Sequence, residues 1–191
     1  GSAEFVRPVH WAVLLWGKEV IPAHILGVAT GDRTRGHRFM APRDIRLASP
    51  TAYVKSLRTK GRVIVDFEER RTLIREGVAA LAAAHGGRAL IGDDLLDEVT
   101  ALVEWPVPVA ARFEERFLQL PREVLIATLQ DHQRYFPVED AEGRLTSLFI
   151  TVANIDSQNP DEVRRGNERV VRPRLADAAF FWDQDRKTSL A

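Results

Sequence analysis

The most suggestive chemistry in the sequence lies in the run 34–39. Arg35 and Arg38 carry guanidinium groups that can bind phosphate oxygens through paired hydrogen bonds. His37 adds an imidazole and Phe39 an aromatic face, beside a glycine that lets the backbone of the loop approach a ligand closely. These residue types indicate a loop that contacts RNA, through Arg33, Arg35, His37 and Arg38. An ordinary exposed loop, with Phe39 in the core, is the alternative.

A second basic run lies further along the sequence, within a predicted helix. Its arginines are Arg164, Arg165, Arg169, Arg172 and Arg174. On a helix they alternate with an apolar face, which suits phosphate contacts or ion pairs with acidic residues of a neighbouring element. Intramolecular salt bridges are therefore the alternative to RNA binding in this run.

Arg134 and Tyr135 form a third candidate for RNA contact, because a hydrogen-bond donor adjoins a stacking surface. Tyr135 and Phe136 point to opposite faces if they lie on a strand. We therefore expect only one of these two rings to be exposed.

The sequence offers no catalytic signature. It has no glycine-rich phosphate loop, no G-x-S-x-G elbow and no H-E-x-x-H motif. Its five histidines include no pair spaced four residues apart, and it has no cysteine, so we predict no metal site. The acidic run 93–98 could hold a divalent cation, but acidic residues are also favoured at a helix start. A solvated helix start is the better interpretation.

Composition indicates a globular domain, with 191 residues of which 45% are hydrophobic and 28% charged. The 27 basic residues balance 27 acidic ones, so attraction to nucleic acid has to come from local patches. Such a patch is predicted between residues 32 and 62, where nine basic residues stand against two acidic ones. No apolar run approaches the roughly 20 residues that cross a bilayer, and no signal peptide is seen, so we expect a cytoplasmic protein without membrane contact.

Periodicity predicts the elements that position these residues. The expected elements are a hairpin over 9–28, helices over 51–57, 67–84, 93–105 and from 121, a second hairpin over 135–153, and a C-terminal helix from about 160. Strands and helices do not alternate regularly, which favours an α+β fold. We expect one domain over 6–191, with both hairpins in one sheet and the helix 67–84 packed on it. Residues 1–5 are interpreted as a cloning scar and the chain as a fragment.

Six runs carry a family resemblance. They are RGHRF at 35–39, LVEWPVP at 102–108, FEERFL at 113–118, QRYFPV at 133–138, VANI at 152–155 and GNERVVRPRLADA at 166–178. In this order they are similar to the β subunit of bacterial heterotetrameric glycyl-tRNA synthetase. The resemblance covers nearly all of the chain, and implies an internal part of β, similar to the B3/B4-type α+β domain of phenylalanyl-tRNA synthetase.

The resemblance implies an enzyme of two α and two β subunits. The α subunit would activate glycine with ATP and magnesium, and the β subunit would bind tRNA(Gly). The implied partners are the α subunit, tRNA(Gly) and a second β subunit. We expect no catalytic residue, metal or cofactor in this chain, and little need for editing, because a pocket shaped for glycine excludes larger amino acids by size. The alternative is a structural spacer between subunits that does not bind RNA.

Overall fold

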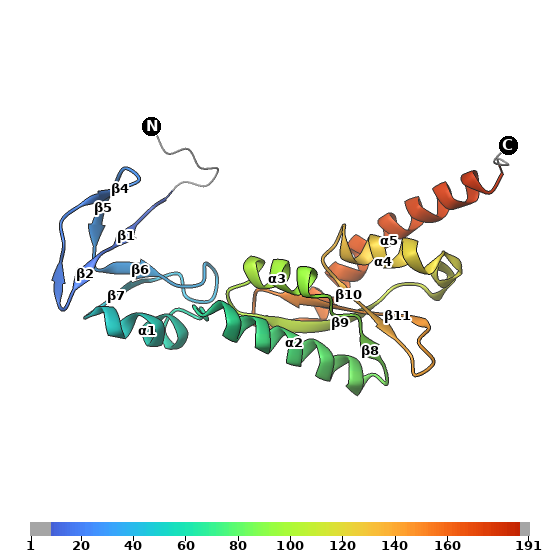
Figure 1. The fold of residues 1–191 in the computed structure, drawn as a ribbon, viewed down its shortest axis with the longest axis horizontal. Helices are drawn as coiled ribbons and strands as arrows, with labels where there is room; N and C mark the ends of the chain where they lie inside the picture. The colour runs from blue at the N-terminus through green and yellow to red at the C-terminus, as the bar shows by residue number, and fades with distance from the viewer. Residues whose placement is uncertain (1–8, 188–191) are drawn as a thin grey trace. The chain divides into compact units, whose positions relative to one another are not determined.

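A computed structural model describes residues 9–187, and the chain divides after Asp66 into two compact units (Figure 1). The first unit runs up to Asp66 and the second begins at Phe67, whereas one domain was expected. Each unit is built around its own hydrophobic residues. The predicted scar at 1–5 lies outside the described residues.

The prediction that both hairpins share one sheet is wrong. The strands of residues 12–31 pair only within the first unit, and those of residues 88–153 form a separate four-stranded sheet. The apolar residues of each set pack against helices of their own unit, so neither set depends on the other for its core.

Short strands make up the start of the first unit. They are β1 (Ala12–Val13), β2 (Leu15–Trp16), β3 (Glu19–Val20), β4 (His24–Ile25) and β5 (Val28–Gly31). β2 and β3 form one tight hairpin, in which Gly17 takes a left-handed φ of 59°. β4 and β5 form another, and β1 pairs with β5 in parallel. Two short hairpins therefore replace the single one predicted over 9–28.

A second sheet of this unit consists of β6 (Arg33–Arg35) and β7 (Asp44–Arg46), in antiparallel pairing. It is followed by the 3-10 helix η1 (Pro50–Ala52) and by α1 (Tyr53–Thr59), which confirm the helix predicted over 51–57. Ile45, Leu47 and Leu57 are buried together and hold β7 against α1. This small core therefore holds together the β6–β7 hairpin and α1, which carry most of the basic residues between positions 32 and 62.

The second unit contains an antiparallel sheet with the order β8 (Arg88–Ala89), β10 (Phe136–Glu139), β11 (Leu145–Ala153) and β9 (Val107–Arg112). The predicted hairpin at the end of this region is confirmed as β10 and β11, joined by a turn in which Gly143 has a φ of 77°. Strand β9 was not predicted, because Pro108 is unusual in a strand and Pro106 comes directly before it. It lies at the sheet edge, where proline is tolerated.

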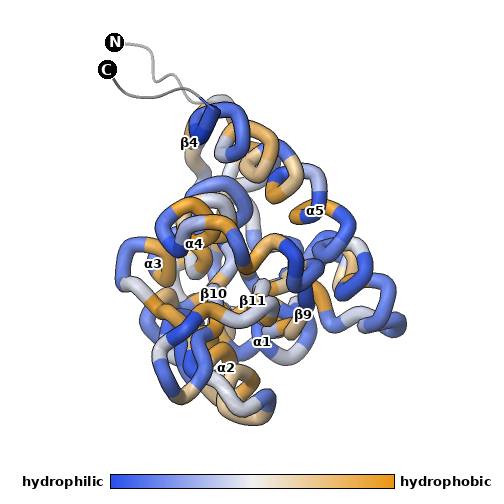
Figure 2. Tube along the Cα trace, turned by 90° about the vertical axis from the view of Figure 1, so that its right-hand side faces the viewer, coloured by the Kyte–Doolittle hydropathy of each residue, from blue (hydrophilic) through white to orange (hydrophobic). Residues whose placement is uncertain are grey.

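Helices cover both faces of this sheet. One face meets α2 (Phe67–Ala84) and α3 (Asp93–Leu102), and the other meets η2 (Glu115–Gln119), α4 (Arg122–Gln130) and α5 (Pro160–Asp185). Successive side chains of β11 point to opposite faces of the sheet. Ile150 packs towards α2, while Phe149 packs towards α4 and α5. Figure 2 shows α2 and α4 on opposite sides of β10 and β11.

The predicted helices are confirmed, except that α3 ends at Leu102 and not at residue 105, and the α+β fold class is confirmed as well. In α2, Ile74, Val78 and Ala82 are fully buried at intervals of four residues, as the predicted apolar stripe required. The C-terminal helix α5 begins where predicted, since the Asn159 side chain accepts a hydrogen bond from the backbone N–H of Glu162. Within residues 9–187, none of the helices combines the length and apolar character that a membrane crossing requires.

Candidate nucleic-acid interface

The division at Asp66 separates charge as well as structure. Residues 1–66 contain eleven Lys or Arg against five Asp or Glu, a net charge of +6, whereas residues 67–191 contain 16 against 22, a net charge of −6. The zero net charge of the whole chain therefore conceals one basic and one acidic unit. A polyanion is attracted to the first unit and repelled by the second.

The β6–β7 hairpin displays part of this positive charge. Thr34 and Ile45 lie opposite each other and are buried, so the neighbouring side chains point outwards. Arg33 lies opposite Arg46 on this outer face, and Arg35 lies opposite Asp44. The run predicted as a loop thus begins as a strand, and the strand directs Arg33 and Arg35 to the exposed face.

Ion pairs neutralise two of these arginines. Arg35 Nε lies 3.0 Å from Asp44 Oδ1, and its guanidinium carbon lies 5.4 Å from the centre of the Trp11 ring. Arg46 Nε lies 2.6 Å from Asp32 Oδ2, and this hydrogen bond is the largest cause of the lowered pKa of the Asp32 carboxyl. Within residues 9–187, Arg33 has no such acidic partner within 4.0 Å. It remains available to a phosphate.

His37 is a structural residue of the loop that follows β6. Its side chain is 2% exposed, and Nδ1 accepts hydrogen bonds of 3.2 Å from the backbone N–H groups of both Phe39 and Met40. The imidazole shapes the loop and does not reach the surface, so we leave His37 out of the proposed RNA contacts.

Arg38 and Phe39 are the exposed members of the same loop. Phe39 is 71% exposed, and the guanidinium carbon of Arg38 lies 5.5 Å from the centre of its ring. The alternative that places Phe39 in the core is wrong. An exposed aromatic ring beside a cation is the combination that binds an unpaired base and its phosphate.

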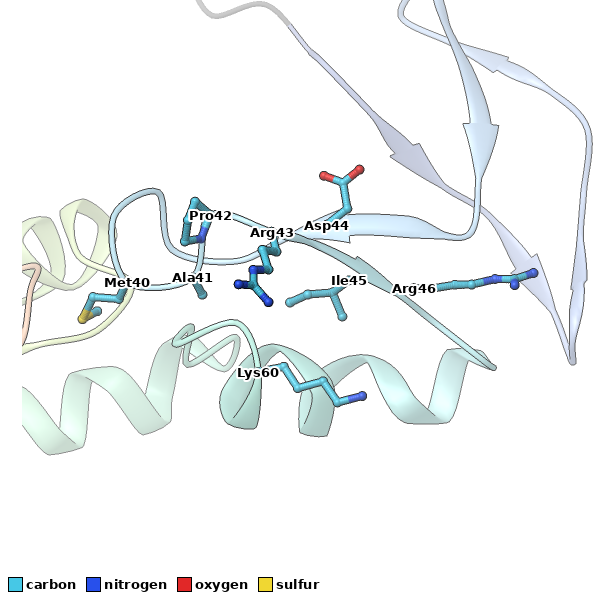
Figure 3. Close-up of a pocket in the computed structure, with 8 residues that line it drawn as sticks. All are labelled: Met40, Ala41, Pro42, Arg43, Asp44, Ile45, Arg46 and Lys60. Atoms are coloured by element: carbon cyan, nitrogen blue, oxygen red, sulfur yellow. The ribbon is translucent and has the colours of Figure 1, made fainter.

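Two further cations lie beside this loop and were not singled out from the sequence. Arg43 and Lys60, together with residues 40–42 and 44–46, line a surface pocket of about 660 Å³ (Figure 3). The two residues are separated by 16 intervening positions, so no sequence pattern joins them. Packing of β7 on α1 brings them to one pocket.

Most arginines of the C-terminal run are occupied by acidic neighbours. Arg164 and Arg165 pair with Asp161 and Glu162 one turn earlier, at 3.0 and 3.6 Å. Arg172 Nε lies 2.7 Å from Glu114 Oε1, which joins α5 to the start of η2. Ion pairing, the alternative for this run, thus accounts for these three arginines. In the part of the chain that the structure describes, Arg169 and Arg174 are exposed and have no ion pair.

Arg134 and Tyr135 stabilise the second unit. Arg134 takes a left-handed φ of 59° after α4, where its Nε lies 2.5 Å from Glu98 Oε1 and its Nη1 donates to the backbone oxygen of Gln130. Tyr135 is only 5% exposed; its ring stacks on Phe149 with centres 4.8 Å apart, and its hydroxyl donates to Asn167 Oδ1 at 2.8 Å. Burial raises the pKa of the Tyr135 phenol.

Phe136 is buried as well, so neither ring of this pair is exposed, against the expectation that one would be. Phe136, the first residue of β10, packs in the hydrophobic cluster on one face of the sheet, and Tyr135, directly before the strand, packs in the cluster on the other face, so alternation exposes neither ring. Tyr135 therefore does not present a stacking surface to RNA in this structure.

The acidic run at the start of α3 binds arginines of α2. Asp93 Oδ1 lies 2.7 Å from Arg75 and from Arg71, and Asp97 lies 2.5 Å from Arg71. The hydrogen bonds from Arg75 and then Arg71 lower the pKa of the Asp93 carboxyl. Between residues 9 and 187, no group of three or more histidines and carboxylates could hold a metal ion.

Comparisons with known proteins support the family resemblance of the six runs. A family model described as glycyl-tRNA synthetase beta subunit matches residues 1–191. The chain is 55% identical over 190 residues to the glycine–tRNA ligase beta subunit of Marinobacter nauticus, and 53% identical over 188 residues to that of Hahella chejuensis. It is 54% identical over 187 residues to that of Pseudomonas aeruginosa. These alignments cover 98–99% of the chain and 27% of each relative, so the chain spans about a quarter of their length.

Proposed function

The chain belongs to the glycyl-tRNA synthetase beta subunit family, and from this premise we propose that its first unit, residues 9–66, binds tRNA. The binding contributes to the attachment of glycine to tRNA(Gly) by the whole enzyme. The observation that carries this proposal is the charge of +6 on residues 1–66, in which Arg33 and Arg38 are exposed and have no ion pair among the described residues.

The second unit contributes less to RNA binding in this proposal. It carries a net charge of −6, and three of its five candidate arginines on α5 already pair with Asp161, Glu162 and Glu114. Arg169 and Arg174 are its remaining candidate contacts. The acidic surroundings weaken any contact that these two arginines make.

The proposal places the rest of the activity outside this chain. The α subunit activates glycine with ATP and magnesium, while residues 1–191 act without a cofactor in the cytoplasm, together with α and a second β subunit. The absence of a glycine-rich phosphate loop from the sequence supports this division of labour. The chain alone is then expected to show no glycine-dependent exchange of pyrophosphate into ATP.

Titration of labelled tRNA(Gly) at several salt concentrations tests the proposal. The expected dissociation constant is about 10⁻⁴ to 10⁻⁶ M, the range of nonspecific nucleic-acid binding. If about three phosphates are neutralised, the logarithm of affinity falls with the logarithm of salt at a slope of roughly −2 to −3. The variant Arg33→Gln/Arg38→Gln is expected to flatten this slope by about 1 to 2.

Arg164→Gln/Arg165→Gln provides the matched control, since it removes the same charge from arginines that are already paired on α5. It is expected to leave the slope unchanged. Absence of tRNA binding by the wild-type chain at 10⁻⁴ M and low salt contradicts the proposal, and so does an equal effect of the two double variants.

A second candidate function is that of a spacer that contacts other subunits without binding RNA. The observation that favours it is the exposed apolar surface of α5, where Val170 and Phe181 lie on one side of the helix and Phe180 is exposed as well. Apolar side chains of this size are often covered by a partner. The tRNA titration separates the two functions, because a spacer predicts no salt-dependent binding.

A further inference from the structure

We propose that the pocket between β7 and the end of α1 binds one phosphate of an unpaired RNA nucleotide, whose base stacks on Phe39. This inference deepens the proposed function and rests on it. It assigns Arg43 and Lys60 as the phosphate-binding pair, and it makes the ligand a single-stranded segment and not a regular duplex.

Some of the charged residues that line the pocket form ion pairs, and others do not. Arg46 pairs with Asp32, and Asp44, the one acidic residue of the lining, pairs with Arg35 on the outer face of the hairpin. Figure 3 shows the Arg43 side chain directed towards α1, while Asp44 points away from it. Among the described residues neither Arg43 nor Lys60 has an acidic partner within 4.0 Å. Two uncompensated cations therefore share one pocket.

The backbone around the pocket is held in place by contacts that do not depend on a ligand. The His37 backbone N–H donates to the Gly61 oxygen at 2.7 Å, and the Ala41 N–H donates to the His37 oxygen at 2.9 Å. The first bond ties the loop to the residue that follows Lys60, and the second closes the loop before Arg43. The backbone that carries both cations is consequently held in place before any ligand arrives, which lowers the entropic cost of binding.

The chemistry of the two cations suits a phosphate. A guanidinium offers two parallel N–H donors that match two phosphate oxygens, and an ammonium adds a compact positive charge. The volume of about 660 Å³ lies within the usual range of ligand pockets, roughly 300–1,000 Å³, and exceeds what one phosphate needs. The remaining space admits the attached ribose.

Phe39 supplies the preference for an unpaired nucleotide. It directly precedes Met40, a lining residue, and its ring is largely exposed. Bases stack on such rings only when they are not already stacked within a duplex. A pair of phosphate-binding cations in a segment that also carries an exposed ring therefore favours flexible, single-stranded RNA.

The experiment uses the 191-residue chain with two labelled probes of equal length, a single-stranded RNA and a fully paired RNA hairpin. Arg43→Gln/Lys60→Gln is expected to flatten the salt slope for the single strand by about 1, the loss of one phosphate contact. Phe39→Leu is expected to weaken single-strand binding about tenfold and to leave hairpin binding unchanged.

The matched control is Lys18→Gln/Lys55→Gln, which removes the same two charges from positions of the first unit that do not line the pocket. An unchanged salt slope in Arg43→Gln/Lys60→Gln overturns the pocket assignment, and an equal effect of both double variants does so too. If Arg33→Gln/Arg38→Gln still flattens the slope for tRNA, only this inference has failed and the proposed function stands.

An equal loss of affinity for the single strand and for the hairpin in Phe39→Leu overturns the preference for an unpaired nucleotide. Circular dichroism melting confirms that each variant is folded.

Discussion

Gly36 lies so close to Gly61 that a Cβ atom on Gly36 would come within 2.4 Å of both the Cα and the carbonyl oxygen of Gly61. The neighbouring His37 N–H donates to that same oxygen at 2.7 Å. This glycine was expected to let the loop backbone approach an RNA ligand closely, whereas in the structure it lets the loop approach a second segment of its own chain. The contact joins the loop after β6 to the end of α1.

We expect Gly36→Ala to destabilise the first unit by about 2 kcal/mol or more, because the added methyl group meets backbone atoms that cannot rotate away. The measurement is amide hydrogen exchange across residues 9–66. Gly31→Ala is the control, since a Cβ there meets nothing within 4 Å. Equal protection in the two variants would show that the contact is not tight in solution.

His37→Ala removes the acceptor for the backbone N–H groups of Phe39 and Met40. We expect a loss of about 1–3 kcal/mol, because both hydrogen bonds to the imidazole are removed. His37→Asn places an amide oxygen near the position of Nδ1 and is expected to lose less. Urea unfolding, followed through hydrogen exchange in residues 37–41, measures both variants. If Asn proves no better than Ala, these two bonds do not stabilise the loop.

Glu139 is a buried carboxylate held between Arg88, at 2.6 Å, and Arg122. We expect Arg88→Ala/Arg122→Ala to cost about 3–5 kcal/mol, because it leaves the buried charge without a partner. Glu139→Gln is expected to cost only about 1 kcal/mol, since both guanidinium groups are partly exposed and can be solvated. Urea denaturation monitored by circular dichroism compares the two. A larger loss of stability in Glu139→Gln than in Arg88→Ala/Arg122→Ala would refute this account of Glu139 and its two arginines.

Tyr135→Phe removes the hydrogen bond to Asn167, and near neutral pH we expect a loss of about 1 kcal/mol. The pH dependence is a second test. Burial raises the pKa of the Tyr135 phenol in the folded protein above its ordinary value of 10.0. The contribution of the phenol to stability is therefore complete below pH 10.0 and is lost as pH rises through the folded pKa. Melting temperatures of the wild type should therefore fall more steeply above pH 10 than those of Tyr135→Phe. Parallel curves would contradict this expectation.

Arg75→Gln is expected to raise the pKa of the Asp93 carboxyl, because the hydrogen bond from Arg75 is the main cause of its lowered pKa. The folded pKa lies below the ordinary value of 3.8, so the contribution of Asp93 to stability is present above that value and is lost as pH falls through the folded pKa. An NMR titration of the Asp93 carboxyl carbon measures the shift. Arg122→Gln, whose side chain pairs with Glu139 instead, should leave the Asp93 titration unchanged.

Local spacing was sufficient to predict the longer elements. The apolar stripe of α2 repeats at helical spacing, and the helix lies at Phe67–Ala84 as expected. Asn159 and Pro160 are start signals that act on their own turn of helix, and α5 begins there. Such signals are contained in a few neighbouring residues, so the sequence alone is enough to interpret them.

Short or irregular strands were not predicted, because they lack such local signals. β6 and β7 have three residues each, too few to show alternation, and only the pairing of Thr34 with Ile45 gives the hairpin a buried face. Strand β9 carries a proline that argues against a strand until its place at the sheet edge is known.

The sequence by itself determined the family, the α+β class, the main helices and the three groups of basic residues. Only the tertiary structure decided which of those residues are exposed and unpaired. Tyr135 meets Asn167, and Arg172 meets Glu114, across 32 and 58 positions of the chain. Arg43 and Lys60 come to one pocket only because β7 packs on α1. Residue type sets what a side chain can bind, whereas burial and ion pairing depend on which distant segments meet, and packing of the whole unit determines that.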